Sequence, residues 1–296
     1  MPNSTRTDPA DRVNQAIQTA GVTPDADVSD PPAAVDAPMI PDQRRESMLR
    51  QLRRHKVLSV HQLMEIFNCS HMTVRRDIAA LEQGGLVYSV PGGVRIASEL
   101  NTEPSHQSKA TIEQPQKHGI ARRASQLLRP GMTAYLDAGT TTLSMVPHIV
   151  ALSGMTVVTN DFAIVQALAE SPVNVIHTGG LLDHANLSSV GGLAAATLRH
   201  VSIDVAFMSA SSWDLRRGVT TPSAPKVEVK CAAMDAASQT VLVATSSKYG
   251  TFGLYKVAGL EQFDLVVTDE GLASAAAAGI REAGVDLAIA AAEPAP

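Results

Sequence analysis

A run of polar and basic side chains opens one predicted helix, and these are the first residues in the sequence that could bind a ligand. Ser70 is a good N-cap residue, because its hydroxyl can accept from the free N–H groups of the first turn. One apolar face follows, formed by Val74, Ile78 and Leu81 at helical spacing. The neighbouring face carries side chains that suit an anion or the base edges of DNA: His71, Met72, Thr73, Arg75 and Arg76. Taken alone, this face is equally well explained as a solvated basic surface.

The segments around this helix favour DNA. A basic helix is expected over 42–56, and residues 59–62 have the S-x-x-Q pattern of a capping box that opens a second, short helix. Two short helices joined by so few residues form a helix-turn-helix. A Pro-Gly-Gly at 91–93 then separates two β-like runs, as in a hairpin. The sequence therefore predicts a winged helix-turn-helix DNA-binding domain over 42–97, with the third helix in the major groove.

The expected role of each side chain on DNA follows from its position. The N-terminal residues of a recognition helix lie nearest the bases, so the base-edge candidates are His71, Met72, Thr73 and Arg75. Ser70, which caps the helix, is also expected at the DNA. Arg76 and Arg95 are expected on phosphates, and Arg44 and Arg45 of the basic helix are secondary candidates.

The distribution of charge agrees with a nucleic-acid partner. The whole chain has a net charge of −5, which argues against DNA binding. Residues 42–96, however, carry nine Lys/Arg and five Asp/Glu, a net +4, so that the rest of the chain carries −9. A basic module on an acidic body is expected when only one part of a protein meets phosphates.

From Lys117 the pattern changes to short apolar runs that alternate with helical segments. The runs lie at 133–137, 155–159, 173–177, 204–209, 240–245 and 263–268, with a weaker one at 284–289. Such alternation predicts a C-terminal α/β domain over 117–290 with a mostly parallel sheet covered on both faces.

Small polar residues follow these runs, at the strand ends where ligands bind in such sheets. Asp137 ends the first run, and Gly139 with three hydroxyls, Thr140, Thr141 and Thr142, leads into a helix, a combination that suits a phosphate. Lys230 and Lys248 are the cations available to neutralise it. The alternatives are a simple N-cap for the threonines and solvated positions for the lysines.

Other classes of site find little support in the sequence. Cys69 and Cys231 are far apart, so neither a disulfide framework nor a metal site is expected, and a cytoplasmic location is the natural interpretation. We see no signal peptide, no membrane span, no cofactor motif and no nucleophile–base signature. Asp137 is the best general base if the domain were catalytic.

Three segments lack a folding pattern. Residues 1–41 are rich in Pro, Asp and Ala and are expected to be a disordered tail. Residues 98–116 are polar, carry two prolines and are expected to form an extended linker. Residues 291–296 are expected to be a short C-terminal tail.

Over nearly its whole ordered length the chain resembles a DeoR-type transcriptional repressor. The motifs that carry this resemblance are MTVRRDIAALEQGGLV and the Gly-Gly of the wing, then LDAGTTT, TVVTN, HTGG, VEVKCAAM and SSKYG in family order. The resemblance implies a non-catalytic sensor domain similar in fold to ribose-5-phosphate isomerase that binds a phosphorylated sugar or related metabolite. It places the ligand contacts on Asp137, Gly139, Thr140, Thr141, Asn160, Gly179, Gly180, Lys230 and Lys248.

The sequence departs from the family pattern at the strand ends. The usual E-A-E-V-K begins with Lys226 here, so that a lysine replaces the first glutamate. The segment 209–212 has alanine and serines where the family has glycines, and Thr245 or Ser246 replaces an aspartate. An atypical effector or an altered response is expected from these changes.

The sequence thus predicts a cytoplasmic, DNA-binding transcriptional repressor, not an enzyme, that a phosphorylated metabolite releases from its operator. Its partners would be double-stranded operator DNA, the small effector and further copies of itself, as a homodimer or homotetramer, with no membrane. One alternative is a sugar-phosphate isomerase-like enzyme with an accessory DNA-binding domain. Another is a regulator that senses a partner protein or an unphosphorylated ligand.

Overall fold

The structure is a computed structural model that describes residues 39–294. The tail predicted for 1–41 therefore lies outside the described residues up to residue 38, and so do the last two residues of the tail predicted for 291–296. Within the part that the structure describes, no helix combines the length and the apolar character needed to cross a membrane.

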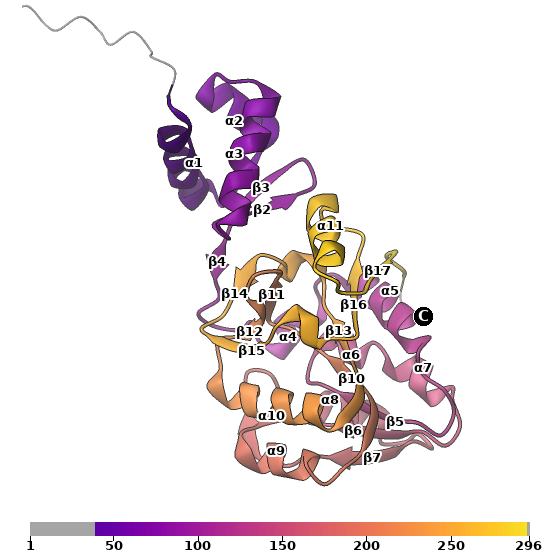
Figure 1. The fold of residues 1–296 in the computed structure, drawn as a ribbon. Helices are drawn as coiled ribbons and strands as arrows, with labels where there is room; N and C mark the ends of the chain where they lie inside the picture. The colour runs from indigo at the N-terminus through magenta and orange to yellow at the C-terminus, as the bar shows by residue number, and fades with distance from the viewer. Residues whose placement is uncertain (1–38, 295–296) are drawn as a thin grey trace, which may run out of the picture. The chain divides into compact units, whose positions relative to one another are not determined.

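The N-terminal domain has three helices and a small antiparallel sheet of strand order β1-β3-β2 (Figure 1). Its elements are α1 (Pro41–His55), β1 (Val57–Ser59), α2 (Val60–Phe67), α3 (His71–Gln83), β2 (Val87–Val90) and β3 (Gly93–Ile96). The predicted capping box is present, because the Ser59 hydroxyl accepts from Gln62 N and the Gln62 side chain accepts from Ser59 N. Met48, Leu63 and Val74, one from each helix, are fully buried in one core. This confirms the winged helix-turn-helix.

Strand β1 was not anticipated, and it explains one wing glycine. Val57, Leu58 and Ser59 pair with β3, where three residues are too few to show a strand pattern. Gly93 lies opposite Ser59, and a Cβ at Gly93 would come within 2.5 Å of the Leu58 carbonyl oxygen. The glycine therefore permits the close approach of the two strands.

The segment predicted as an extended linker is ordered. It contains β4 (Ser98–Glu99) and α4 (His106–Ala110), and α5 (Gln114–Ser125) begins within it. Strand β4 pairs in parallel with β14 (Thr251–Phe252), and His106 N donates to the Ala185 carbonyl. These contacts join the segment to parts of the C-terminal domain that are distant in sequence, which no local pattern could show.

The C-terminal domain is built on a seven-stranded parallel sheet of order β17-β16-β13-β10-β5-β6-β7. Its strands are β5 (Thr133–Leu136), β6 (Thr156–Thr159), β7 (Asn174–His177), β10 (Ile203–Met208), β13 (Ala237–Val243), β16 (Leu265–Asp269) and β17 (Leu287–Ala290). Every predicted apolar run forms a strand of this sheet, which confirms the α/β fold.

Helices cover both faces of the sheet (Figure 1). Adjacent residues along a strand enter opposite cores: Leu242 packs with one set of helices, and Val241 and Val243 pack with the other. The first set is α9 (Gly192–Leu198), α10 (Ala224–Asp235) and α11 (Ser274–Glu282), and the second is α5, α7 (Val146–Val150) and α8 (Phe162–Leu168).

The helix predicted to follow the threonines after Asp137 is two short helices, α6 (Thr140–Leu143) and α7. Pro147 lies in the first turn of α7, where its missing N–H needs no partner, whereas inside a continuous helix it would remove a hydrogen bond.

Short antiparallel strands that were not predicted extend the domain beside the main sheet. One hairpin is β8 (Leu181–Asp183) with β9 (Ser188–Val190), and a small sheet joins β11 (Ser212–Asp214), β12 (Gly218–Thr221) and β15 (Tyr255–Ala258). Two single-turn 3₁₀ helices, Ser246–Lys248 and Leu260–Gln262, follow β13 and β15.

Candidate functional site

The first candidate site is the exposed face of α3. The Ser70 hydroxyl caps the helix by accepting from Thr73 N at 3.3 Å, and its Oγ lies 2.9 Å from Thr73 Oγ1. Met72 is 60 % exposed, and Arg75 Nε donates to His71 Nε2 at 3.3 Å. Arg75 and Arg76 are exposed, whereas the opposite face of the helix is buried. The structure therefore brings the predicted DNA-reading side chains together at the start of one exposed helix face.

Arg44 and Arg45, the secondary candidates, are both paired within the N-terminal domain. Arg44 Nε lies 2.5 Å from Asp77 Oδ2, and the Asp77 side chain is only 4 % exposed. The hydrogen bond to Asp77 is the largest cause that raises the pKa of Arg44. Arg44 thus neutralises a buried carboxylate of α3, while Arg45 pairs with Asp42 in the exposed first turn of α1.

Arg95, which was expected on a phosphate, contacts the C-terminal domain. Its guanidinium donates to two backbone carbonyls of the C-terminal domain, Ser247 O at 3.0 Å and Tyr249 O. Burial lowers its pKa from the ordinary arginine value. The Nη1 and Nη2 groups of Arg95 are therefore engaged by the C-terminal domain, whereas its buried Nε has no hydrogen-bond partner among the described residues. The expected contact of Arg95 with a phosphate stays a prediction, and alternation along the strand could not show that this side chain also contacts a second domain.

Tyr88 of β2 also contacts the C-terminal domain, and the sequence analysis did not single it out. Its hydroxyl donates to Asp214 Oδ2 at 2.9 Å, and Asp214 is fully buried. Arg217 Nη1 in turn donates to the Tyr88 hydroxyl at 3.1 Å. A Cβ at Gly250 would come within 2.4 Å of the Tyr88 ring, so only a glycine at this position leaves room for the ring. Burial, with the Asp214 charge, raises the pKa of Tyr88 well above its usual value.

The second candidate site lies at the carboxyl end of β5. Asp137 is 2 % exposed, and its Oδ2 accepts from Ser209 N at 2.9 Å and from Ser209 Oγ at 2.7 Å. Lys230 of α10 forms an ion pair with the same carboxylate and also donates to Ser209 O at 2.8 Å. The predicted Asp137 and Lys230 are therefore partners, although 93 residues separate them.

Asn160 and Asp161 hold the loop that follows Asp137. Asn160 Oδ1 accepts from the Tyr135 hydroxyl and from Ala138 N, each at 3.0 Å. Asp161 Oδ2 accepts from Gly139 N at 3.0 Å. The first N–H groups of the predicted phosphate loop are thus already bound by side chains of the next strand end.

The threonines of this loop differ in their availability. Thr142 is fully buried, and its hydroxyl donates to Asp137 O at 2.6 Å, so it shapes the loop. Thr141 is also buried, whereas Thr140 lines a neighbouring cavity. Gly139 lies against Ser209, where a Cβ would approach to 3.0 Å. Among the threonines of the loop, Thr140 is the one that lines the cavity.

Gly179 and Gly180 allow a backbone conformation that other residues rarely adopt. Both have positive φ angles, +63° and +118°, and a Cβ at Gly180 would come within 3.0 Å of Ala194 on α9. They are not among the residues that line the two cavities described next.

Two adjoining cavities form the candidate effector site. The inner one is about 10 Å³ and is lined by Asp137, Asn160, Lys226 and Lys230, among others. The outer one is about 240 Å³, and its polar lining includes Lys109, Lys117, Thr140, Ser211 and Lys248. Glu103 and Ser211 line both cavities. Glu103, Lys109 and Lys117 come from the ordered segment at 98–116 and the helix after it, so sequence reasoning did not place them here.

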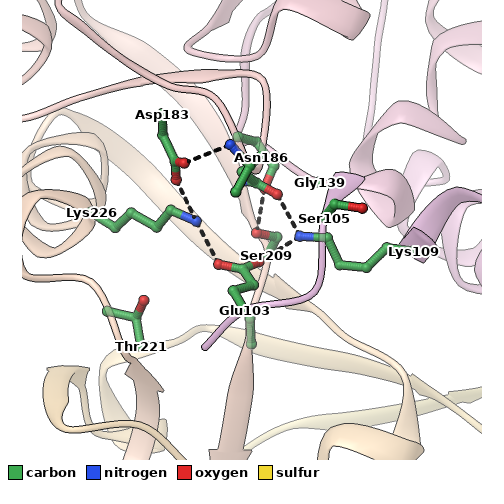
Figure 2. Close-up of polar contacts among 12 residues, drawn as sticks. Glu103, Ser105, Lys109, Gly139, Asp183, Asn186, Ser209, Thr221 and Lys226 are labelled. Atoms are coloured by element: carbon green, nitrogen blue, oxygen red, sulfur yellow. Dashed lines mark hydrogen bonds and ion pairs between the residues drawn. The ribbon is translucent and has the colours of Figure 1, made fainter. Parts of the chain in front are cut away.

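A network of charges surrounds Glu103 (Figure 2). Lys109 Nζ donates to Glu103 Oε1 at 2.5 Å, and Lys226 pairs with Glu103 Oε2 and, at 3.0 Å, with Asp183. Lys109 also donates to the Asn186 amide oxygen. Lys226 is the lysine that departs from the family pattern, and the structure shows its two carboxylate partners.

Lys248, like Lys117, differs from the lysines of the site that pair with a carboxylate. Its Nζ donates to the Ala210 carbonyl at 2.7 Å, and in the described part of the chain it forms no ion pair with a carboxylate. Burial, assisted by the charge of Lys109, lowers its pKa to about 8. It is therefore a cation that an incoming anion can neutralise. Among the residues that the structure describes, no group of His, Cys, Asp or Glu side chains could hold a metal ion.

Comparisons with known proteins agree with this two-domain arrangement. Residues 44–99 match the model of the DeoR-like helix-turn-helix domain, and residues 112–270 match the DeoR C-terminal sensor domain. The regulator YgbI of Escherichia coli K12 is 42 % identical over 85 % of this chain and 99 % of its own length. A regulator of Haemophilus influenzae is 42 % identical over 84 % of this chain and 97 % of its own.

More distant matches include a putative aga operon transcriptional repressor of Escherichia coli O157:H7, 29 % identical over 83 % of this chain and 92 % of its own length. Solved structures that match include ribose 5-phosphate isomerase A of Methanocaldococcus jannaschii, 15 % identical over 45 % of this chain and 53 % of that one, with a TM-score of 0.34. Because both domain models match in order along the chain, this protein belongs to the DeoR family of helix-turn-helix transcriptional regulators.

Proposed function

We propose that this regulator represses transcription by binding a specific operator through α3, and that a small phosphorylated metabolite bound between Lys248 and Thr140 changes its affinity for DNA. The observation that supports the DNA part is the group at the capped start of α3, formed by the exposed His71, Met72, Arg75 and Arg76 with the half-buried Thr73. In a winged helix-turn-helix, residues at this end of the third helix read bases in the major groove.

The observation that supports the effector part is the 240 Å³ cavity with Lys248 in its wall. A buried ammonium group without a carboxylate partner is costly, and a dianionic phosphate would remove that cost. Thr140 and Ser211 add hydroxyl donors to the same wall. The cavity volume is close to the lower end of the range for small-molecule sites, about 300 Å³, which suits a small sugar phosphate.

We propose that the active form is a homodimer or a larger homo-oligomer, since a helix-turn-helix reads two half-sites with two copies. Light scattering coupled to size exclusion, with and without operator, tests this. A monomer in both states would contradict it.

The alternative of an isomerase-like enzyme needs a free acid or base at the site. Asp137 was the best candidate, but its Oδ2 already accepts from both Ser209 donors and pairs with Lys230. This arrangement supports a structural role for Asp137. A turnover assay with pentose and hexose phosphates discriminates, because isomerisation that is lost in Asp137→Asn would establish an enzyme.

The proposal is tested by a gel shift on DNA from the promoter regions that flank its own gene, with a panel of sugar phosphates added. We expect a specific complex without ligand and a changed complex with one of the phosphates. If phosphorylated metabolites neither change the complex nor shift the melting temperature, the sensor responds to another ligand or to a partner protein.

A further inference from the structure

Glu103 stands between the inner and the outer cavity of the candidate effector site, and its side chain is 13 % exposed. Its two carboxylate oxygens are bound by different lysines: Oε1 accepts from Lys109, and Oε2 accepts from Lys226 (Figure 2). The Glu103 carboxylate therefore fills the position between the ammonium groups of Lys109 and Lys226, and Glu103 lines both cavities.

The Glu103 carboxylate and the Lys226 ammonium group each keep the other charged. Burial by itself would raise the pKa of Glu103, but Lys226 and Lys109 lower it to about 2. Burial by itself would lower the pKa of Lys226, but the Glu103 and Asp183 carboxylates raise it. The lysine pair is thus built to hold a carboxylate, and any group that takes the place of Glu103 must also be anionic.

The two anion positions of the site differ in one respect. Lys248, in the wall of the outer cavity, forms no ion pair with a carboxylate of the described chain, whereas the position between Lys109 and Lys226 is filled by Glu103. Glu113 also lines the outer cavity, where its Oε2 accepts from Ser247 Oγ at 2.9 Å. Only about 10 Å³ is free in the inner cavity, so the group that replaces Glu103 has to be of similar size. A carboxylate fits this requirement, and the larger phosphate fits the outer cavity.

We propose that Glu103 holds the place of an acidic group of the effector, and that the effector carries two such groups, a phosphate and a carboxylate, as in a phosphorylated sugar acid. This inference rests on the proposed function. The phosphate of the effector lies beside Lys248, and its carboxylate replaces the Glu103 carboxylate between Lys109 and Lys226.

Replacement of Glu103 also gives the effector a route to the DNA-binding domain. Glu103 lies in the ordered segment that follows β3, between β4 and α4. This segment is held on one side by the pairing of β4 with β14 and on the other by Lys109 of α4. Displacement of the Glu103 side chain breaks its ion pairs with Lys109 and Lys226, which help to hold this segment. Because the effector binds only when Glu103 is displaced, it favours the arrangement of the segment in which these ion pairs are broken.

The ligand class is tested by calorimetric titration of the full chain with matched sets of four-, five- and six-carbon compounds. Each set contains a phosphorylated aldonate, the aldose phosphate and the aldonate without phosphate. We expect one phosphorylated aldonate to bind at least about tenfold more tightly than both of its matched compounds, because each of these lacks one anion. An aldose phosphate or an aldonate that binds as tightly, or the absence of binding throughout the panel, would overturn the proposal.

The role of Glu103 is tested by Glu103→Gln. Removal of an internal competitor should tighten binding of the best phosphorylated aldonate by about tenfold. Glu99→Gln, which removes an exposed charge from the same segment, is the control and should leave the affinity unchanged. Glu103→Asp keeps the charge but shortens the side chain, so it should tighten binding by a smaller factor even if Glu103→Gln folds poorly. Unchanged or weaker binding in both variants contradicts the proposal.

Operator binding by the unliganded wild-type chain separates this inference from the proposed function. If the chain binds its operator specifically while the ligand results fail, only the inference falls. If operator binding itself fails, the proposed function falls as well.

Discussion

The Arg95 guanidinium on β3 donates a 3.0 Å hydrogen bond to the Ser247 carbonyl, and Ser247 lines the 240 Å³ cavity. The wing sheet of the DNA-binding domain therefore ends at the wall of the candidate effector site. Lys248, the next residue, is one of the cations of that wall. A ligand that moves the turn at Ser247 and Lys248 would directly change the hydrogen bond between Arg95 and Ser247.

We expect Arg95→Ala to separate effector binding from its effect on DNA. The variant loses the contact with Ser247, so the effector should change operator affinity several-fold less than in the wild-type protein, with its own affinity nearly unchanged. Titrations of labelled operator at several salt concentrations supply a second readout. The salt dependence should be that of the wild type, and a slope reduced by about one would instead show Arg95 on a phosphate.

Arg75→Ala should weaken operator binding. Loss of a bidentate contact to a base costs about 1–3 kcal/mol, so we expect roughly a tenfold to hundredfold weaker complex with relaxed specificity at one position. Arg199→Ala, which removes an exposed arginine next to α9, is the matched control. Equal effects of the two substitutions would mean that α3 contributes only non-specific charge.

Effector binding should weaken as the pH rises past 8. The pKa of Lys248 is lowered to about 8, mainly by burial, so its ammonium form is present below that pH and is lost above it. Between pH 7 and pH 9 the protonated fraction falls about tenfold, and the affinity for a phosphate-bearing ligand should fall with it. Calorimetry across this range is the measurement. In Lys248→Met the affinity should be low at every pH, and a retained slope would assign the titration to another group.

Asp77→Ala should destabilise the N-terminal domain strongly. Asp77 is buried beside Arg44, and removal of one partner of a buried ion pair costs about 3–5 kcal/mol. Glu46→Ala removes the partner of Arg50 in an exposed pair, where the loss should stay below about 1 kcal/mol. Urea unfolding followed by circular dichroism compares the two. Similar midpoints for both variants would contradict the structural role of Asp77.

Local patterns predicted the parts of the fold that depend on local sequence. The capped start of α3 follows from Ser70 and the apolar spacing after it, and each strand of the large sheet was visible as an apolar run. Contacts between distant segments were not predictable in this way. Glu103 meets Lys226 across 123 positions, and Arg95 meets Ser247 across 152. Polar residues in an apparently unpatterned segment gave no sign that they would form the wall of a site.

The departure at Lys226 was visible in the sequence, but its meaning was not. A lysine in place of a glutamate indicated a changed site, and only the structure shows that Glu103 and Asp183 neutralise it. The same holds for Asp137, where the sequence left a base and a structural role open and the contacts with Ser209 and Lys230 favour the latter.

Fluorescence anisotropy with DNA from the promoter next to its gene tests the central claim most directly, that α3 finds a specific sequence. At physiological salt the protein should bind one such fragment at least about 10³-fold more tightly than unrelated DNA of the same length, and Arg75→Ala should remove most of this difference. Equal affinity for the promoter fragments and the unrelated DNA, or specificity unchanged in Arg75→Ala, would contradict it.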